Sequence, residues 1–570
     1  MEEVQLPVID HTNVAQVFLV NCGFFLRRVL VHGIERNGLR RSADVEYFFT
    51  RSEEIEIFLC ILVFVLRRLS VPEFHVATHD IVTELVIALL HHNQLLIEED
   101  VLVIRQCQAE RHQTDDDETA HNDHPLRNGG DVVVLHGMSI YSSEVKIFCS
   151  GIGGIGLSAY ASHMRASGHD VLGSDRAASP LIDDLRSQGI LVHTKQVGSG
   201  IPGDVDLFVY SEAIPEDSPE RAEAKRRGVK QQSYFQALGE LTAGSNLIAV
   251  CGTHGKSTTT AMAIGVLTET GLDPNAIVGT KLSFLDGQNW RRGATDLWIV
   301  EACEYRRSFL FLKPTIVLLT NADGDHFDAF KDAQDYRSAF VEFLSGMPKD
   351  GIVIAHGSDE QSRMILESSK KSFIDADLED LPVLSIPGMH MRKNAQLVAA
   401  LGKHLALDES VVKKSLREYA GSWRRMEVKG TKSGITVIDD YAHHPVEIRA
   451  TLSAMKEAYP GRRIVAVFQP HTHDRTLKLW DDFAKSFQDA DEILISSVYD
   501  ARPDKDSERV DEKKFAEAVE KESKKPCKAS GGIEKTEQIL CSEVLKAGDV
   551  VVVMGAGNIT KLSDDLMRNL

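Results

Sequence analysis

Short apolar runs that end at polar residues recur along the chain from residue 144 onward, and segments with helix-like spacing separate them. A short apolar run bounded by turn residues is typical of a strand buried on both faces. The first such run is Val145–Cys149, followed by His169–Asp175 and Asp206–Tyr210. Alternation of strands with helical segments predicts a parallel sheet covered by helices.

The same pattern starts again near residue 247 and once more after about residue 420. The further predicted strands are Leu247–Val250, Leu297–Val300, Thr315–Thr320, Gly351–Ile354, Thr436–Asp439, Arg463–Phe468, Glu492–Ser496 and Val550–Met554. The fold class predicted from this pattern is α/β, with three consecutive domains at 144–245, 246–415 and 416–570.

Residues 1–137 differ from the rest and hold ten of the 22 histidines and the polar tract His112–His124. Neither a repeat nor a motif is evident in them. Two interpretations stay open. Residues 1–137 are either upstream sequence before a start at Met138, or an appended domain of unknown role.

Composition narrows the class of protein. The 570 residues predict three or four domains, and the formal charge of −20 argues against nonspecific binding to nucleic acid or to an anionic membrane. The longest apolar run, Ile57–Leu66, is about half of the ~20 residues that a membrane span needs. Eight cysteines are scattered and form no Cys-x-x-Cys pair, so we expect a reducing, cytoplasmic location.

A glycine-rich segment follows the first predicted strand. Gly151, Gly153 and Gly156 have the spacing that lets a backbone approach a pyrophosphate at a helix N-terminus. Asp175, about 20 residues further on, stands where a ribose partner is expected. The segment therefore predicts a dinucleotide or nucleoside-diphosphate site, with NAD, FAD and a UDP-sugar all compatible, and a tight turn without a ligand is the alternative.

A second loop, Cys251–Thr260, follows the apolar run that ends at Val250. The usual phosphate loop has an earlier glycine at the position of Val250, so this loop is shorter. Gly252, Gly255, Lys256 and Ser257 nevertheless supply small residues, a lysine for the β- and γ-phosphates and a hydroxyl for Mg²⁺. The alternative is a tight turn that carries a lysine by chance.

Carboxylates and a histidine follow the next two predicted strands. Glu301 ends one of them, and Asp323, Asp325 and His326 follow the other. Hard oxygen ligands suit Mg²⁺, and one imidazole can serve a second divalent ion. A strand-end carboxylate is also a common helix cap, so the order of the motifs has to decide between the two interpretations.

The motifs together resemble the Mur ligase family. The loop Gly252–Thr260 resembles its ATP loop, and four later segments also match its patterns. These are Gly388–Ala395, Asp439–Pro445, Phe468–Thr476 and Gly555–Ile559, the last with Asn558 where the family has Asp. The resemblance covers about 144–570 and leaves out 1–137. It implies a Rossmann-like UDP-binding domain, a central P-loop ATPase domain and a Rossmann-like C-terminal domain.

Within the family, the branch that joins L-alanine to UDP-N-acetylmuramate is the most similar. Gly151–Ser158, Gly173–Asp175, Ser211–Ile214 and Glu301–Tyr305 all resemble its segments. The resemblance implies peptidoglycan precursor synthesis, with ATP and Mg²⁺ as cofactors. It also implies that ATP first phosphorylates the lactyl carboxylate and that the amine of alanine then attacks the acyl phosphate.

The resemblance also implies a role for each site residue. UDP-sugar binding is assigned to Gly151, Gly153, Gly154, Gly156, Asp175 and Ser211. ATP binding is assigned to Gly252, Thr253, His254, Gly255, Lys256, Ser257, Thr258, Asn394 and Arg425. Metal binding is assigned to Ser257, Glu301 and His326, and alanine binding to Tyr441, His443 and Arg475. The catalytic groups implied are Lys256, His443, Arg424 and Arg425.

Other functions remain possible on the sequence. They are another ligase of the family, such as one that recycles a murein tripeptide, an NAD-dependent oxidoreductase, and a non-catalytic nucleotide-binding protein. The first shares the sugar nucleotide, and the second leaves the lysine loop without a role. Oligomeric state and strict preference for alanine over glycine or serine are not predicted.

Overall fold

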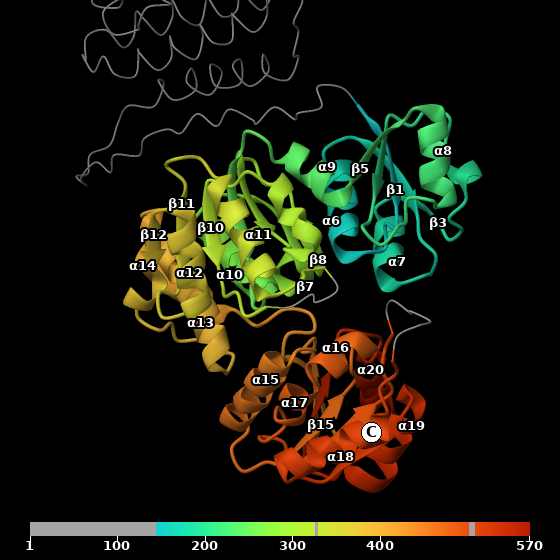
Figure 1. Ribbon diagram of the computed structural model, residues 1–570, viewed down its shortest axis with the longest axis vertical. Helices are drawn as coiled ribbons and strands as arrows, with labels where there is room; N and C mark the ends of the chain where they lie inside the picture. The colour runs from blue at the N-terminus through green and yellow to red at the C-terminus, as the bar shows by residue number, and fades with distance from the viewer. Residues whose placement is uncertain (1–143, 325–328, 501–507) are drawn as a thin grey trace, which may run out of the picture. The chain divides into compact units, whose positions relative to one another are not determined.

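The computed structural model describes residues 144–324, 329–500 and 508–570, which fold into three sheets with helices packed against them (Figure 1). Residues 1–137 and the candidate metal ligand His326 lie outside these ranges. Each described domain is of the α/β class, so the predicted fold class is confirmed.

The first sheet is fully parallel, with strand order β3-β2-β1-β4-β5. Its strands are β1 (Lys146–Ser150), β2 (Asp170–Ser174), β3 (Leu191–His193), β4 (Leu207–Tyr210) and β5 (Lys230–Ser233). Its helices are α6 (Ile155–Ala166), α7 (Pro180–Ser187), α8 (Pro219–Arg227) and α9 (Tyr234–Leu241). Ile147 and Cys149 pack in one buried cluster while Phe148 belongs to another, because side chains alternate between the faces of a strand.

The middle sheet has the order β12-β11-β10-β6-β9-β7-β8 and is parallel except for the β7–β8 pair. Its strands are β6 (Asn246–Cys251), β7 (Asn275–Leu282), β8 (Gln288–Arg291), β9 (Leu297–Glu301), β10 (Ile316–Leu319), β11 (Ile352–Ala355) and β12 (Phe373–Asp375). Its helices are α10 (Lys256–Glu269), α11 (Ala333–Ser345), α12 (Glu360–Ser369), α13 (Met389–His404) and α14 (Glu409–Glu418).

The third sheet has the order β13-β14-β18-β15-β16-β17, with β13 antiparallel to β14. Its strands are β13 (Glu427–Lys432), β14 (Ile435–Asp440), β15 (Ile464–Phe468), β16 (Glu492–Ser496), β17 (Cys527–Gly531) and β18 (Val550–Met554). Its helices are α15 (Pro445–Ala458), α16 (His473–Lys478), α17 (Trp480–Ala484), α18 (Glu512–Ser523), α19 (Ile533–Ile539) and α20 (Thr560–Asn569).

Every strand predicted from the apolar runs coincides with an observed strand, and these predictions are confirmed. The strands that the pattern missed include six at sheet edges: β3, β5, β8, β12, β13 and β17. Edge strands are short or partly polar because one side lacks a strand neighbour; β5, for example, reads Lys-Gln-Gln-Ser. None of the helices in the described ranges has the length and apolar character that crossing a membrane requires.

Candidate active site

The first glycine-rich loop joins β1 to α6 at the carboxyl ends of the strands. Gly151 has a φ of 77°, and a Cβ there would lie 3.0 Å from Cβ of Ser211. The N–H of Gly153 donates to the carboxylate of Asp175 at 2.9 Å. Connections leave in opposite directions from β1 and β4, and open α/β sheets bind ligands in the crevice at that point. The loop glycines, Asp175 and Ser211 therefore lie at the carboxyl ends of the central strands, where a nucleotide is expected.

Two of the loop glycines, Gly154 and Gly156, also determine how α6 begins and packs. Gly154 is the N-cap of α6, and a Cβ at Gly156 would lie 2.8 Å from the ring of Tyr234 on α9. The absence of a Cβ at Gly156 therefore lets α6 and α9 pack closely.

Glu220, at the start of α8, supports the same strand ends and was not predicted. Its buried carboxylate accepts hydrogen bonds from the hydroxyls of Ser150 at 2.5 Å and Ser174 at 2.8 Å. Burial raises the pKa of this carboxyl above its ordinary value. Glu220 thus ties the ends of β1 and β2 together directly beneath the loop.

The phosphate loop joins β6 to α10. Gly255 has a φ of 80°, and a Cβ there would lie 2.5 Å from Oδ1 of Asn394, which places this predicted ATP-binding residue against the loop. Thr320 and Asn321 fix the loop: the Thr320 hydroxyl donates to the His254 carbonyl at 2.6 Å, and Oδ1 of Asn321 accepts the His254 N–H at 2.9 Å. The N-terminus of α10 therefore carries a rigid cradle whose helix dipole favours an anion.

Lys256 lies inside this cradle. Its ammonium donates to the carbonyl of Thr253 at 3.0 Å and pairs with Glu304 at 3.0 Å. Glu304 is completely buried and was not predicted as a site residue. The lysine is therefore held over the loop by a carboxylate that follows β9.

Ser257 and Glu301 form the candidate metal site. The Ser257 hydroxyl donates to Oε1 of Glu301 at 3.0 Å, and Oε2 of Glu301 accepts the N–H of Gly279 at 2.8 Å. Two hard oxygens at the foot of the phosphate loop fit Mg²⁺. Among the described residues, no group of three or more His, Cys, Asp or Glu side chains could hold a metal.

The adjacent arginines point to different places. Arg424 is buried, donates to the carbonyl of Gly557 at 3.2 Å and lies 3.5 Å from the carboxylate of Asp439. Arg425 instead donates to the hydroxyl of Ser257 at 3.3 Å. Of the two, Arg425 is the one that reaches the phosphate loop.

The predicted alanine residues lie together in the third domain. The rings of Tyr441 and His443 are 5.3 Å apart, and the ring of His471 lies 5.8 Å from that of His443. Arg475 contacts Nδ1 of His471 at 3.3 Å, and the ring of Tyr499 stacks on His471. His471 and Tyr499 were not predicted, although His471 lies within a motif that the sequence brought forward.

A cavity of about 150 Å³ lies beside the phosphate loop. Its lining includes the ATP candidates His254, Gly255, Thr258, Asn394 and Arg425, together with Asp440 and Glu447. Side chains from the middle and third domains thus line one small cavity.

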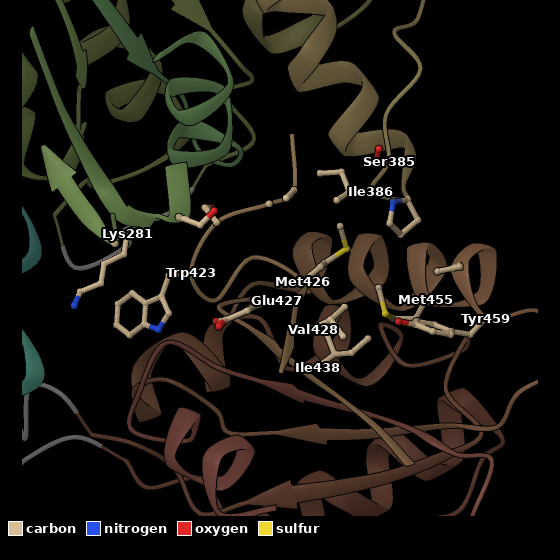
Figure 2. A pocket seen from close by; sticks show the side chains of 17 residues that line it. Lys281, Ser385, Ile386, Trp423, Met426, Glu427, Val428, Ile438, Met455 and Tyr459 are labelled. Atoms are coloured by element: carbon tan, nitrogen blue, oxygen red, sulfur yellow. The ribbon is translucent and has the colours of Figure 1, made fainter. Parts of the chain in front are cut away.

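A larger cavity, of about 620 Å³, lies near the linker between these domains (Figure 2). Its lining includes Met426, Ile438 and Met455. None of the described candidate site residues lines it. The 150 Å³ cavity, which five of the ATP candidates line, is therefore the better candidate for nucleotide chemistry.

Asn558 departs from the family pattern without loss of a contact. Its Oδ1 accepts a hydrogen bond from Nε2 of Gln469 at 3.1 Å. An aspartate would present the same oxygen, so the asparagine preserves this link between β15 and the loop after β18.

The fold and this site define an α/β nucleotide-dependent enzyme. Three family models match consecutive parts of the chain: the Mur ligase family catalytic domain at 146–246, the Mur ligase middle domain at 250–380, and the Mur ligase glutamate ligase domain at 424–557. The chain belongs to the Mur ligase family.

Individual relatives match over nearly their whole length. The UDP-N-acetylmuramate–L-alanine ligase of Clostridium acetobutylicum is 36% identical over 450 residues, which are 74% of this chain and 96% of that protein. The ligase of the same name from Lachnospira eligens is 36% identical, over 75% of this chain and 99% of its own.

Two solved structures of ligases are similar to this chain over nearly their whole length. The UDP-N-acetylmuramate–alanine ligase of Thermotoga maritima has a TM-score of 0.63 and 28% identity, covering 75% of this chain and 99% of its own. A murein peptide ligase from Psychrobacter arcticus has a TM-score of 0.57 at 23% identity, over 75% of this chain and 99% of its own. The second likeness concerns the fold.

Proposed function

We propose that this protein joins L-alanine to the lactyl carboxylate of UDP-N-acetylmuramate at the expense of ATP, in peptidoglycan precursor synthesis. The relatives named for this reaction match at 36% identity over 96% and 99% of their length. The observation that carries the proposal is the meeting of the phosphate loop with the third domain, where Arg425 donates to Ser257 at 3.3 Å.

A carboxylate is a poor electrophile because its negative charge repels an amine. One of its oxygens therefore attacks the γ-phosphorus of ATP first, ADP leaves, and an acyl phosphate forms. Phosphoryl transfer depends mostly on positioning and on charge neutralisation. Lys256 and Arg425 supply cationic groups on either side of the loop and act on the phosphates.

Mg²⁺ supplies further neutralisation of the phosphate charge when it is bound. Ser257 and Glu301 are the proposed residues for one ion, which their 3.0 Å separation and oxygen chemistry support. His326, outside the described residues, is proposed for a second ion by resemblance. Asn394, against Gly255, is proposed to read the adenine edge.

The sugar nucleotide is assigned to the first domain. Its diphosphate is proposed to lie on the N–H groups of the Gly151 loop, with Asp175 and Ser211 beside it. The supporting geometry is the position of these residues at the crevice between β1 and β4.

Alanine is assigned to Tyr441, His443 and Arg475. Arg475 is suited to pair with the alanine carboxylate as a fork. His443 is suited to accept a proton from the ammonium, after which the nitrogen lone pair attacks the acyl carbon and phosphate leaves. We also propose that the reaction takes place in the cytoplasm, as expected from the scattered cysteines, which form no Cys-x-x-Cys pair.

The test is phosphate release by the purified full-length chain with ATP and UDP-N-acetylmuramate. L-Alanine, glycine, L-serine and the murein tripeptide are supplied one at a time. We expect phosphate release, corrected for the background without an amine, to be greatest with L-alanine, and the mass spectrum to show a new UDP-N-acetylmuramoyl-L-alanine product. Phosphate release that depends on the tripeptide and not on alanine would reassign the amine substrate. The absence of phosphate release with all four amines would overturn the proposal.

A further inference from the structure

Glu447 is the one described carboxylate that contacts both the phosphate loop and the proposed alanine site. It lies in the first turn of α15, and its Oε1 lies 3.0 Å from Nδ1 of His254 on the loop. Its Oε2 lies 3.3 Å from the ring nitrogen Nδ1 of His443. The same oxygen accepts the backbone N–H of His443 at 2.9 Å. The contact with His254 joins residues 193 positions apart in the chain.

The surroundings keep this carboxylate ionised. Burial by itself would raise its pKa, but the positive charges that His443 and His254 carry when protonated, and the hydrogen bond from His254, outweigh burial and hold the pKa of Glu447 well below its ordinary value. An ionised carboxylate accepts hydrogen bonds and donates none. Nδ1 of His254 must therefore carry the proton in the contact with Oε1.

The tautomer of His443 follows from a second contact. Its Nδ1 lies 3.0 Å from the carbonyl oxygen of Tyr441, which can only accept a hydrogen bond. Nδ1 of His443 thus carries a proton, and in the neutral ring the lone pair is on Nε2. A neighbouring carboxylate that fixes the ring in this tautomer makes Nε2 the nitrogen able to take a proton.

We propose that Glu447 is a positioning residue that couples the phosphate loop to amine activation: by holding His254 and His443 with one carboxylate, it orients His443 toward the ammonium of alanine when the loop is docked on the third domain. This inference rests on the proposed function. The ammonium proton passes to Nε2, the C–N bond forms, and the bond from the acyl carbon to the phosphate oxygen breaks.

Glu447→Gln is a suitable test because it preserves the helix start. Glu447 also accepts the N–H of His444 at 3.2 Å, as the last residue of a capping box, and glutamine serves at that position as well. The amide removes the charge beside His443 and cannot offer a second oxygen to His254. The variant is therefore expected to fold and to lose the coupling.

The matched control is Glu457→Gln, on the same helix. Glu457 pairs with Arg392 of α13 at 2.8 and 3.0 Å, so it also joins the third domain to the middle domain. It does not contact His254 or His443 in any described hydrogen bond or ion pair. The control removes a contact between the same two domains without touching the proposed alanine site.

The readout compares two amines with ATP and UDP-N-acetylmuramate. Alanine arrives as an ammonium and needs a base, whereas hydroxylamine is uncharged near neutral pH and attacks an acyl phosphate directly, giving a hydroxamate and phosphate. We expect Glu447→Gln to lower kcat with alanine at least tenfold, since a general base contributes about 10²–10⁴-fold and this residue orients it. We expect the KM for alanine to stay within about threefold and the hydroxylamine rate within about twofold.

Several results would overturn the inference. An unchanged alanine rate in Glu447→Gln, an equal loss with both amines, or an equal loss in Glu457→Gln would each show that the carboxylate does not position the base. If the unaltered protein releases no phosphate with alanine, the proposed function itself fails and this inference falls with it. If the unaltered protein is active with alanine and Glu447→Gln has the same kinetics as the unaltered protein, the proposed function stands and only this inference is wrong.

Discussion

The ammonium of Lys256 lies 3.0 Å from a carboxylate oxygen of Glu304, whose side chain is fully buried. Burial lowers the pKa of the lysine, but the charge of Glu304 outweighs it, and the pKa is raised above its ordinary value. The lysine of the phosphate loop is therefore held as a cation before any nucleotide contacts it.

Replacing this lysine should separate catalysis from sugar binding. We expect Lys256→Ala to lower kcat by about 10²–10³-fold, comparable to the loss of one preorganised donor at ~3–4 kcal/mol. Calorimetry should give an unchanged Kd for UDP-N-acetylmuramate, because the Gly151 loop is on another sheet. Normal turnover by the variant would refute the assignment of the loop.

The ion pair of Lys256 and Glu304 also allows the effect on folding to be separated from the effect on catalysis. Lys256→Ala leaves Glu304 buried without its cation, which is strongly destabilising, so the variant should have a lower Tm. Adding Glu304→Gln should recover much of the Tm and none of the activity. Recovery of activity in the double variant would mean that the lysine serves the fold rather than the phosphates.

The adjacent arginines should have opposite phenotypes. Arg424→Ala removes a buried guanidinium from Asp439 and the Gly557 carbonyl, so we expect a loss of about 3 kcal/mol or more of stability and a clearly lower Tm. Arg425→Ala should leave the Tm nearly unchanged and lower kcat/KM for ATP at least tenfold. Thermal unfolding and steady-state kinetics check both, and the reverse pattern would contradict the assignment of Arg425 to the phosphates.

The candidate metal site should appear in the Mg²⁺ requirement. Glu301→Gln replaces one charged oxygen beside Ser257, and we expect the Mg²⁺ concentration for half-maximal rate to rise about tenfold or more. Glu367→Gln, an exposed carboxylate on α12, is the matched control and should leave it unchanged. An unaltered Mg²⁺ response in Glu301→Gln would remove this residue from the metal site.

Asp440 should make stability depend on pH near neutrality. Burial raises the pKa of its carboxyl from 3.8 to about 6. The folded state therefore holds the proton more tightly than the unfolded chain, and the stability from this group is full below about pH 3.8 and is lost as pH rises through about 6. We expect the Tm of the unaltered protein minus that of Asp440→Asn to fall between pH 4 and pH 7.

Asp408→Asn provides the control for this pH dependence. Hydrogen bonds from Ser410 lower the pKa of Asp408, so its titration lies below that range, and the corresponding Tm difference should stay flat between pH 5 and 7. A flat difference for Asp440 as well would contradict the raised pKa.

The sequence predicted most of the central strands and both loops because each has a local signature; the interior strand β7 was missed. Buried parallel strands are continuous apolar runs, and a phosphate loop needs particular residue types at fixed spacing after a strand. Polar edge strands such as Lys230–Ser233 have no such signature. Local pattern therefore sufficed for most of the core strands and failed at the sheet edges and at β7.

The supporting carboxylates could not be predicted, because their partners are distant in sequence. Glu304 lies 48 positions from Lys256, and Glu447 lies 193 positions from His254. Nor could spacing decide between Arg424 and Arg425, which are neighbours. The positive φ of 56° at Arg424 and its buried carbonyl partners direct the two side chains to different places.

The central claim is that ATP activates the sugar carboxylate as an acyl phosphate, and oxygen transfer tests it most directly. UDP-N-acetylmuramate labelled with ¹⁸O in its lactyl carboxylate is turned over with ATP and L-alanine, and the released phosphate is examined by mass spectrometry. We expect one carboxylate oxygen to appear in each phosphate, because the C–O bond to the phosphoryl group breaks when the amine attacks. Phosphate without ¹⁸O, formed alongside the alanine product, would contradict the account.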